Sequence, residues 1–247
     1  MGDDDAVGRP GELWIEQRQL VDQVVEKLRD AITRGHFRPG QVVRQAALAE
    51  QMGVSRTPLR MALSILTSQG LLQRNGSRGY VVPGYSYDGA IDLYRLREMV
   101  LAYVCRLAAE RITDAQLAEL GDVVDEAEEF VEARDWPGWL QANELFGACV
   151  ARSTGVLLLE QFLETIGTQA RVFQPTLLAS ADDARERLTG AAREHRAIYE
   201  AIRDRDPKAA ERAARTHVAN SRKRFEATHR ASTRDTRDAG TAGGEAR

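Results

Sequence analysis

Hydrophobic residues recur three and four positions apart along most of this chain, which is the period of amphipathic helices. In the N-terminal third, one stripe predicts a helix that ends before Gly35 and the pair Pro39-Gly40. Its members are Val21, Val24, Val25, Leu28 and Ile32. A second stripe predicts a helix that Gly70 ends, and it comprises Leu59, Ala62, Leu63 and Leu66.

The segment before this second stripe predicts a short helix, a turn and a new helix start. The short helix ends at Gly53, and Val54-Ser55 turns the chain. Ser55 is a good N-cap, and Pro58 is tolerated in the first turn, where the N–H groups have no helical partner. This layout is typical of a helix-turn-helix, whose second helix enters the DNA major groove. We therefore predict that the protein reads DNA.

Polar side chains lie on the side of this second helix opposite its apolar stripe. Arg56 and Arg60 are one turn apart, and we expect them to contact base edges or the adjacent phosphates. Arg44, Ser55 and Thr57 are the expected phosphate contacts, beside a helix N-terminus that itself favours anions.

A β-hairpin follows. Residues 71–74 and 80–82 read as strands, and Asn75-Gly76 between them is a strong turn signal. A hairpin after a helix-turn-helix is a wing, and its tip, Arg78-Gly79, is expected to reach toward the minor groove. Taken singly these signals are ordinary surface features; their order along the chain makes them specific.

From residue 87 onward the pattern predicts only helices, with no strand-like alternation. Thr113 and Gln116 have the spacing of a capping box, and Asp206-Pro207 begins the last helix. The predicted ranges are 88–111, 113–133, 137–152, 156–172, 184–204 and from 206 onward. Helices joined by short connections form an antiparallel bundle, here of six or seven helices.

The predicted fold is therefore mainly α, with two domains between two tails. We expect a winged helix-turn-helix domain at 15–82, a hinge at 83–87 and an all-helical domain for effector binding and dimerisation at 88–230. Residues 1–14 and 231–247 lack apolar periodicity, and we expect disordered tails there.

Charge agrees with this division. Residues 15–82 contain ten Lys or Arg against five Asp or Glu, although the whole chain of 247 residues has a net charge of −3. Positive charge thus gathers where DNA is expected. No apolar run approaches the ~18 residues of a membrane span, and no secretory leader is evident, so we expect a cytoplasmic protein with no membrane partner. The two cysteines, Cys105 and Cys149, have no metal-like spacing.

Four polar residues interrupt the apolar stripes of the second half: Arg97, Asn143, His195 and His217. Buried polar groups are costly unless they find partners, so four of them in one bundle suggest a cavity with a ligand. The alternative is that each is a satisfied core residue, and for Arg97 a salt bridge to a Glu on a neighbouring helix.

In these residues and their spacing, the chain resembles the GntR family of bacterial transcription regulators, in its FadR-like subgroup with an FCD effector domain. The resemblance covers residues 15–228. It rests on Gly35, Pro39-Gly40, Leu48-Ala49, the run from Gly53 to Arg60, Leu63, Leu66, Gly70-Leu71 and Gly79, and then on Leu96-Arg97-Glu98, Asn143, Phe146, His195 and His217. It implies a homodimer on a palindromic operator in double-stranded DNA, usually a repressor, that responds to a small organic acid.

The resemblance also implies effector-binding residues: Arg97, Asn143, Gly147, His195 and His217. An arginine fork suits a carboxylate effector. In many members of the subgroup four of these positions hold a divalent metal. Here Asn143 and Gly147 replace an Asp and a His, so the metal site (His195, His217, Asn143) is incomplete, and we expect weak or no metal binding and no certain cofactor.

Two other readings remain. A metal-dependent enzyme on the bundle is disfavoured because the sequence has no HExxH pair, glycine-rich phosphate loop or nucleophile elbow, so we expect no enzyme activity. An effector-independent DNA-binding protein is disfavoured, more weakly, by the inward polar residues.

Overall fold

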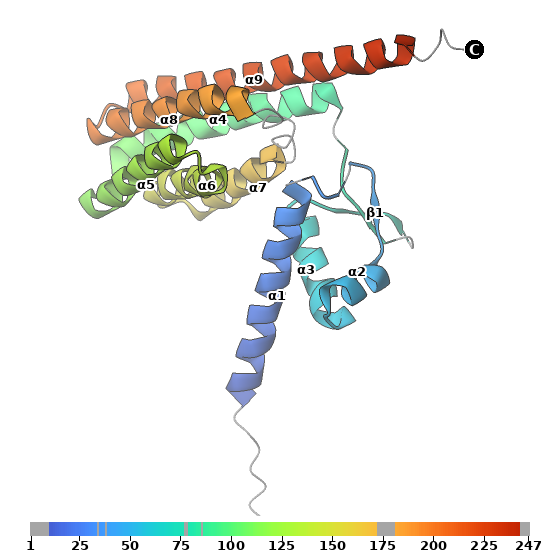
Figure 1. Cartoon of the computed structure of the whole chain (residues 1–247). Coiled ribbons are helices and arrows are strands. Elements are labelled where there is room, and N and C mark those ends of the chain that lie inside the picture. The colour runs from blue at the N-terminus through green and yellow to red at the C-terminus, as the bar shows by residue number, and fades with distance from the viewer. Residues whose placement is uncertain are drawn as a thin grey trace, which may run out of the picture. The chain divides into compact units, whose positions relative to one another are not determined.

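The computed structural model describes residues 10–33, 35–37, 39–76, 79–84, 86–171 and 181–242. The chain divides into two compact units, residues 1–85 and 86–247 (Figure 1). The division falls inside the range expected for the hinge, 83–87.

The first unit has three helices and a small sheet. The helices are α1 (Pro10–Thr33), α2 (Gln45–Met52) and α3 (Arg56–Ser68), and the strands are β1 (Val42–Val43), β2 (Gln73–Arg74) and β3 (Tyr80–Val81). The predicted helix-turn-helix and hairpin are therefore confirmed.

The core of this unit lies between α1 and α3. Every residue of the two predicted stripes is buried, and Leu59, Leu63 and Leu66 have no exposed surface. At the end of α3, Arg29 of α1 donates a hydrogen bond from Nη2 to Gln69 Oε1 at 3.2 Å. The packing of these two helices fixes α3 and leaves its opposite side in solvent.

The sheet is antiparallel and has the order β1-β3-β2. Val43 pairs with Tyr80 on one side of β3, and Arg74 pairs with Tyr80 on the other. The sequence analysis did not predict β1, because two residues are too few for an alternation to be recognised. This strand ties the wing to the chain between α1 and α2.

The second unit consists of six helices over its described residues, as predicted. They are α4 (Tyr87–Arg111), α5 (Asp114–Ala133), α6 (Trp136–Ser153), α7 (Leu157–Arg171), α8 (Ala181–Arg203) and α9 (Pro207–Ala242). The capping box is confirmed: the Thr113 side chain accepts from the Gln116 N–H, and the Gln116 side chain accepts from the Thr113 N–H. Asp135 caps α6 by accepting from the Gly138 N–H at 3.0 Å.

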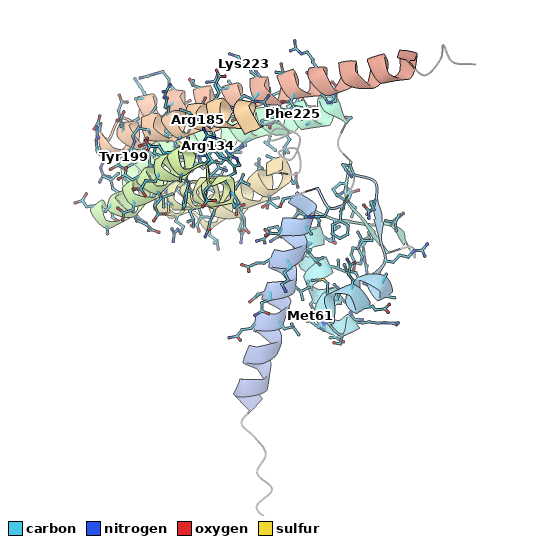
Figure 2. All side chains as sticks on the ribbon, viewed as in Figure 1. Met61, Arg134, Arg185, Tyr199, Lys223 and Phe225 are labelled. Carbon is cyan, nitrogen blue, oxygen red and sulfur yellow. The ribbon has the colours of Figure 1, made fainter. Side chains whose placement is uncertain are left out.

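Helices α4 and α9 pack against each other more extensively than any other pair of helices in the described part of this unit. Phe225 of α9 is buried against Tyr94 of α4, with ring centroids 5.6 Å apart (Figure 2). Helix α8 packs against α5 and α9, and α7 packs against α4 and α6. This arrangement brings α4, α6, α8 and α9 around a shared interior.

Two helix ends differ from the predicted boundaries. Helix α1 begins at Pro10, before the predicted domain start at 15, and α9 continues to Ala242, past the predicted limit at 230. Apolar periodicity does not detect such polar helical turns, and residues 231–239 contain neither Gly nor Pro to end a helix. No helix over the described residues is long and apolar enough to cross a membrane.

Candidate functional site

The turn between α2 and α3 presents the start of α3 to solvent. Gly53 adopts φ +64°, the left-handed region, and ends α2. Ser55 then has the extended backbone of an N-cap, but its side chain makes no capping hydrogen bond. The first-turn N–H groups of α3 are therefore not satisfied by this side chain, and they are suited to bind an external anion.

The predicted DNA-contact residues of this region are all exposed. Arg56, Thr57 and Arg60 lie on the solvent side of α3, and Arg44 is exposed at the N-cap of α2. Leu59, between these residues in sequence, has no exposed surface and holds the helix in place. The structure thus places Ser55, Arg56, Thr57 and Arg60 in solvent at the start of α3, and Arg44 in solvent at the start of α2.

A groove lies between α3 and the hairpin. Its lining residues are Arg60, Met61, Ser64, Thr67, Arg74 and Tyr80. Met61 is 53% exposed, so an apolar side chain stands beside the two arginines. The sequence analysis did not single out Met61, Ser64 or Arg74, although Ser64 lies one turn after Arg60 on the same face.

Only one of the two residues predicted to contact DNA at the wing tip can be placed. Arg78 lies outside the described residues. Gly79 is half-buried with φ +110°, and a Cβ atom there would lie 2.6 Å from Val43 O. The glycine is therefore required for the approach of the hairpin to β1, whatever it contacts on DNA.

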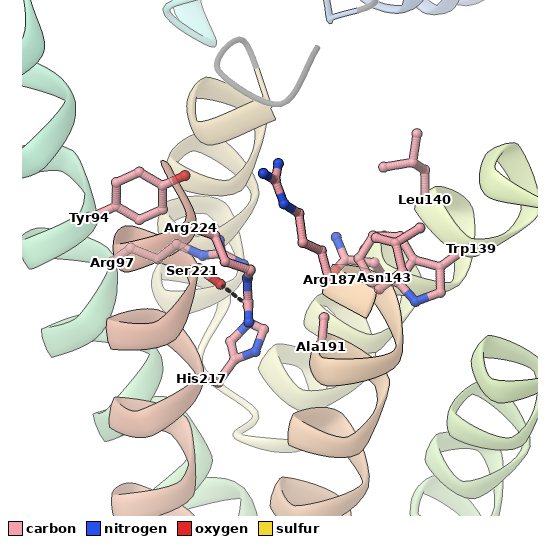
Figure 3. A pocket seen from close by; sticks show the side chains of 11 residues that line it. Tyr94, Arg97, Trp139, Leu140, Asn143, Arg187, Ala191, His217, Ser221 and Arg224 are labelled. Atoms are coloured by element: carbon pink, nitrogen blue, oxygen red, sulfur yellow. Dashed lines mark hydrogen bonds between the residues drawn. The ribbon is translucent and has the colours of Figure 1, made fainter. Parts of the chain in front are cut away.

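In the second unit, a pocket of about 620 Å³, open solvent at its mouth included, lies among α4, α6, α8 and α9 (Figure 3). Of the five predicted effector residues, Arg97, Asn143 and His217 line it, whereas His195 and Gly147 do not. The other lining residues are Tyr94, Trp139, Leu140, Arg187, Leu188, Ala191, Ser221 and Arg224. The pocket therefore brings three of the five predicted residues together, and its lining contains two arginines, Arg187 and Arg224, that were not predicted.

His195 lies outside the lining because aromatic rings enclose it. Its ring stacks on Phe146 with centroids 4.1 Å apart, and Trp139 lies parallel to it at 6.4 Å. The side chain is almost fully buried, and its Nδ1 atom has no hydrogen-bond partner among the residues that the structure describes. Burial lowers the pKa of His195 well below its usual value, so the imidazole is neutral at pH 7. Its ring contacts that of His217, which lines the pocket, with centroids 4.8 Å apart.

A buried ionic network lies beside the pocket. Glu194 Oε2 accepts a hydrogen bond from His217 Nδ1 at 2.9 Å, and Glu194 Oε1 accepts one from Asn220 Nδ2 at 2.9 Å. The guanidinium of Arg224 donates to both carboxylate oxygens, at 3.0 and 3.1 Å. Arg224 also donates to Ser221 Oγ at 3.0 Å. This network fixes the direction of Arg224 at the pocket wall.

The pKa values of the network follow from these contacts. Burial raises the pKa of Glu194, but hydrogen bonds from His217 and Arg224 outweigh it and lower this pKa to about 2. Burial lowers the pKa of His217, and the nearby Arg97 charge adds to the effect, against the opposing influence of Glu194. Glu194 is therefore ionised and His217 neutral at pH 7.

The residues present do not fit a divalent metal. Asn143 has no charge, and Gly147 has no donor: the position of its missing Cβ has no atom within 4 Å. The Nδ1 atom of His217 is already bonded to Glu194, whose carboxylate is held by Arg224. Over the described part of the chain, no group of three or more His, Cys, Asp or Glu is placed to hold a metal ion. Three arginines in the lining also oppose a cation.

Some pocket residues that the sequence analysis missed had a signal. Arg224 lies one turn after Ser221 and two turns after His217 on the same face of the last predicted helix. Arg187 directly precedes Leu188, which lies two turns before His195 on the same face. Glu194 directly precedes His195, and Trp139 lies one turn before Asn143 on the same face, so both had comparable signals that the sequence analysis did not use.

Comparisons with known proteins agree with the geometry. The FCD domain matches residues 92–220, and the gntR family of bacterial regulatory proteins matches residues 20–82. The first range covers most of the second unit, and the second covers α3 and the wing.

Two curated relatives and one solved structure illustrate the similarity. The Nta operon transcriptional regulator of Aminobacter aminovorans is 40% identical over 110 residues, which are 44% of this chain and 49% of that relative. The galactonate operon transcriptional repressor of Escherichia coli is 26% identical over 83% of this chain and 96% of that protein. The structure of E. coli McbR/YncC has the same fold, with a TM-score of 0.73 at 21% identity over 85% of this chain and 98% of that one.

Proposed function

The chain belongs to the gntR family of bacterial regulatory proteins and carries an FCD domain, and from its geometry we propose a homodimeric repressor that binds a palindromic operator and responds to a small organic carboxylate. That the protein is a DNA-binding transcription regulator follows from the family. The operator symmetry, the dimer and the effector are the proposal.

The exposed N-terminus of α3 is the observation that supports operator binding most directly. Arg56 and Arg60 extend from a helix whose opposite face is fully buried, and Ser55 leaves the first-turn N–H groups uncapped. Such a helix can enter the major groove with its arginines toward guanine edges and its N–H groups toward a phosphate. Each bidentate arginine–guanine contact discriminates against other bases by about 1–3 kcal/mol.

The test is an unbiased selection of duplexes by the purified full chain at moderate salt. We expect an enriched palindrome with two half-sites about one helical turn apart. An Arg56→Ala variant is expected to relax sequence preference at one position of each half-site. If no duplex is preferred over random DNA, the proposed operator binding is refuted.

An exposed apolar surface on the second unit supports the dimer. On α4 it comprises Leu96, Met99 and Tyr103, and on α7 it comprises Leu157, Leu158 and Phe162. The two helices are neighbours, because Leu93 of α4 packs with Ile166 of α7. Exposed apolar patches of this kind mark interaction surfaces, and a second copy would place two α3 helices on one duplex.

Met99 is 65% exposed and provides the test. We expect Met99→Glu to convert a dimer to a monomer in sedimentation equilibrium, because it places a charge in the interface. A Gln141→Glu variant changes an exposed residue of α6 and is the matched control. A wild-type chain that sediments as a monomer would refute the proposed dimer.

The pocket supports the effector proposal. Arg97 and Arg224 line it from α4 and α9, and guanidinium groups are charge-assisted hydrogen-bond donors to a carboxylate. A bound effector changes operator affinity only if it favours one placement of the DNA-reading units over another. Replacing Arg97 by Ala is expected to abolish the effector response and to leave operator binding intact, and loss of both together would argue for a purely structural role.

A further inference from the structure

The pocket of the second unit has walls of different character. Helices α4 and α9 contribute Tyr94, Arg97, His217, Ser221 and Arg224, which are polar. Helices α6 and α8 contribute the apolar side chains, Trp139, Leu140, Leu188 and Ala191, together with Asn143 and Arg187. Figure 3 shows the arginines of the polar wall on one side and Leu140 and Trp139 on the other.

The polar wall is suited to an acidic group. None of the described residues that line the pocket is Asp or Glu, whereas three are Arg. Arg224 is held in place by Glu194 from behind and bonds Ser221 beside it. Arg187 carries its guanidinium between the two walls, where it faces the same space (Figure 3). An acidic group here finds preorganised donors at one end of the pocket.

The opposite wall is suited to an apolar body. Trp139, Leu188 and Ala191 are almost fully buried, and each exposes at most 7% of its surface. Hydroxyl groups placed against Leu188 and Ala191 would lose their hydrogen bonds to water without replacement. The pocket encloses about 620 Å³, open solvent at its mouth included, and it extends from the polar wall to these apolar side chains.

We propose that the effector is an amphipathic organic acid: one carboxylate held by Arg97 and Arg224, with an apolar, unhydroxylated body against Trp139, Leu140 and Leu188. This inference rests on the proposed function, since it names the ligand class for the same pocket. It excludes polyhydroxylated sugar acids and dicarboxylates as the preferred class.

Four six-carbon probes separate these classes by isothermal titration of the full-length protein. Hexanoate has the acidic group and the apolar body, gluconate is hydroxylated, adipate has a second carboxylate, and hexan-1-ol has no charge. We expect saturable binding of hexanoate, at least about tenfold tighter than each of the other three. From butanoate to hexanoate, each added methylene is expected to strengthen binding about fourfold.

Two variants test the two walls. Arg97→Met is expected to weaken hexanoate binding about 10–100-fold, because a charge-assisted hydrogen bond is lost. Its control is Arg95→Met, on the same helix but exposed and paired with Asp92 at 2.9 Å. Leu140→Asn is expected to reduce the preference for hexanoate over gluconate, whereas Leu145→Asn, at an exposed position of the same helix, leaves it unchanged.

The proposal is overturned if gluconate or adipate binds tightest, if hexan-1-ol binds as well as hexanoate, or if hexanoate shows no saturable binding in the millimolar range. Equal losses in the Arg97 and Arg95 variants also overturn it. Operator binding by the unliganded protein is measured on the same preparation. Sequence-specific DNA binding together with a failed probe series refutes the ligand class alone, whereas failure to select any duplex refutes the proposed function.

Discussion

Replacement of Glu194 by Gln tests whether the buried network stabilises the second unit as its geometry implies. Glu194 accepts four hydrogen bonds, from His217, Asn220 and twice from Arg224. Its side chain is only 13% exposed, so water does not replace these contacts. Glutamine keeps the size of the side chain but removes its charge and places an NH₂ group where an oxygen accepted hydrogen bonds.

The expected loss in the free energy of unfolding can be estimated in two ways. A pKa lowered from 4.5 to about 2 corresponds to about 3 kcal/mol of stability at neutral pH. Removal of one partner of a buried ion pair costs about 3–5 kcal/mol, because the other charge stays buried. We therefore expect Glu194→Gln to lower the free energy of unfolding by about 3 kcal/mol at pH 7, or by about 1 M in the urea midpoint.

Urea unfolding of the full chain, followed by tryptophan fluorescence, measures this loss in the relevant unit, because Trp136 and Trp139 both lie in α6. The matched control is Glu211→Gln on α9, since Glu211 is paired with Arg215 at 3.0 Å at the surface. Exposed ion pairs contribute little, so the control midpoint is expected to stay close to wild type.

The pH dependence gives the sharper criterion. Because the pKa of Glu194 is lowered on folding, its contribution is complete above about pH 4.5 and is lost as pH falls toward 2. The difference between wild type and Glu194→Gln is therefore expected to shrink below pH 4.5, with about half of it gone at pH 3. A difference of equal size at pH 7 and pH 3, or a loss no larger than that of the control, would refute the electrostatic reasoning.

Three further predictions follow from single residues. Gly79→Ala should destabilise the first unit by about 1–3 kcal/mol in urea unfolding, because φ +110° and the 2.6 Å approach to Val43 O both disfavour a Cβ; a neutral effect would contradict this. Arg60→Ala should flatten base preference in a duplex selection, whereas uniform weakening across all sequences would assign Arg60 to phosphate. His195 is neutral in the folded protein and takes up a proton below about pH 6.5 in the unfolded chain, so the free energy of unfolding falls as the pH is lowered. His195→Phe should make this fall smaller by about 1.4 kcal/mol per pH unit between pH 6 and 5. If urea unfolding at these pH values shows the same fall in the variant as in wild type, His195 is not its cause.

The helices were predictable because the buried face of each one repeats in the sequence. The stripe of α1 and the leucines of α3 are all buried, and helices α4 to α8 start and end close to their predicted limits, whereas α9 continues past residue 230. Gly53 was predictable for a different reason: a helix that must turn sharply needs a left-handed residue, and glycine adopts it without strain. Strand β1 could not be predicted, because its two residues are set by pairing with β3 rather than by a local pattern.

The candidate site was only half predictable, because a pattern shows which face a residue lies on but not which neighbours it meets. His195 and His217 occupy corresponding inward positions on α8 and α9, yet Phe146 and Trp139 enclose the first, and only the second reaches the pocket. The choice depends on the aromatic side chains of α6, which pack across from α8 and are distant in sequence. Glu194 shows the same limit in a stronger form. It sits beside the predicted histidine, and only the fold brings it to Arg224, whose guanidinium it fixes at the pocket wall.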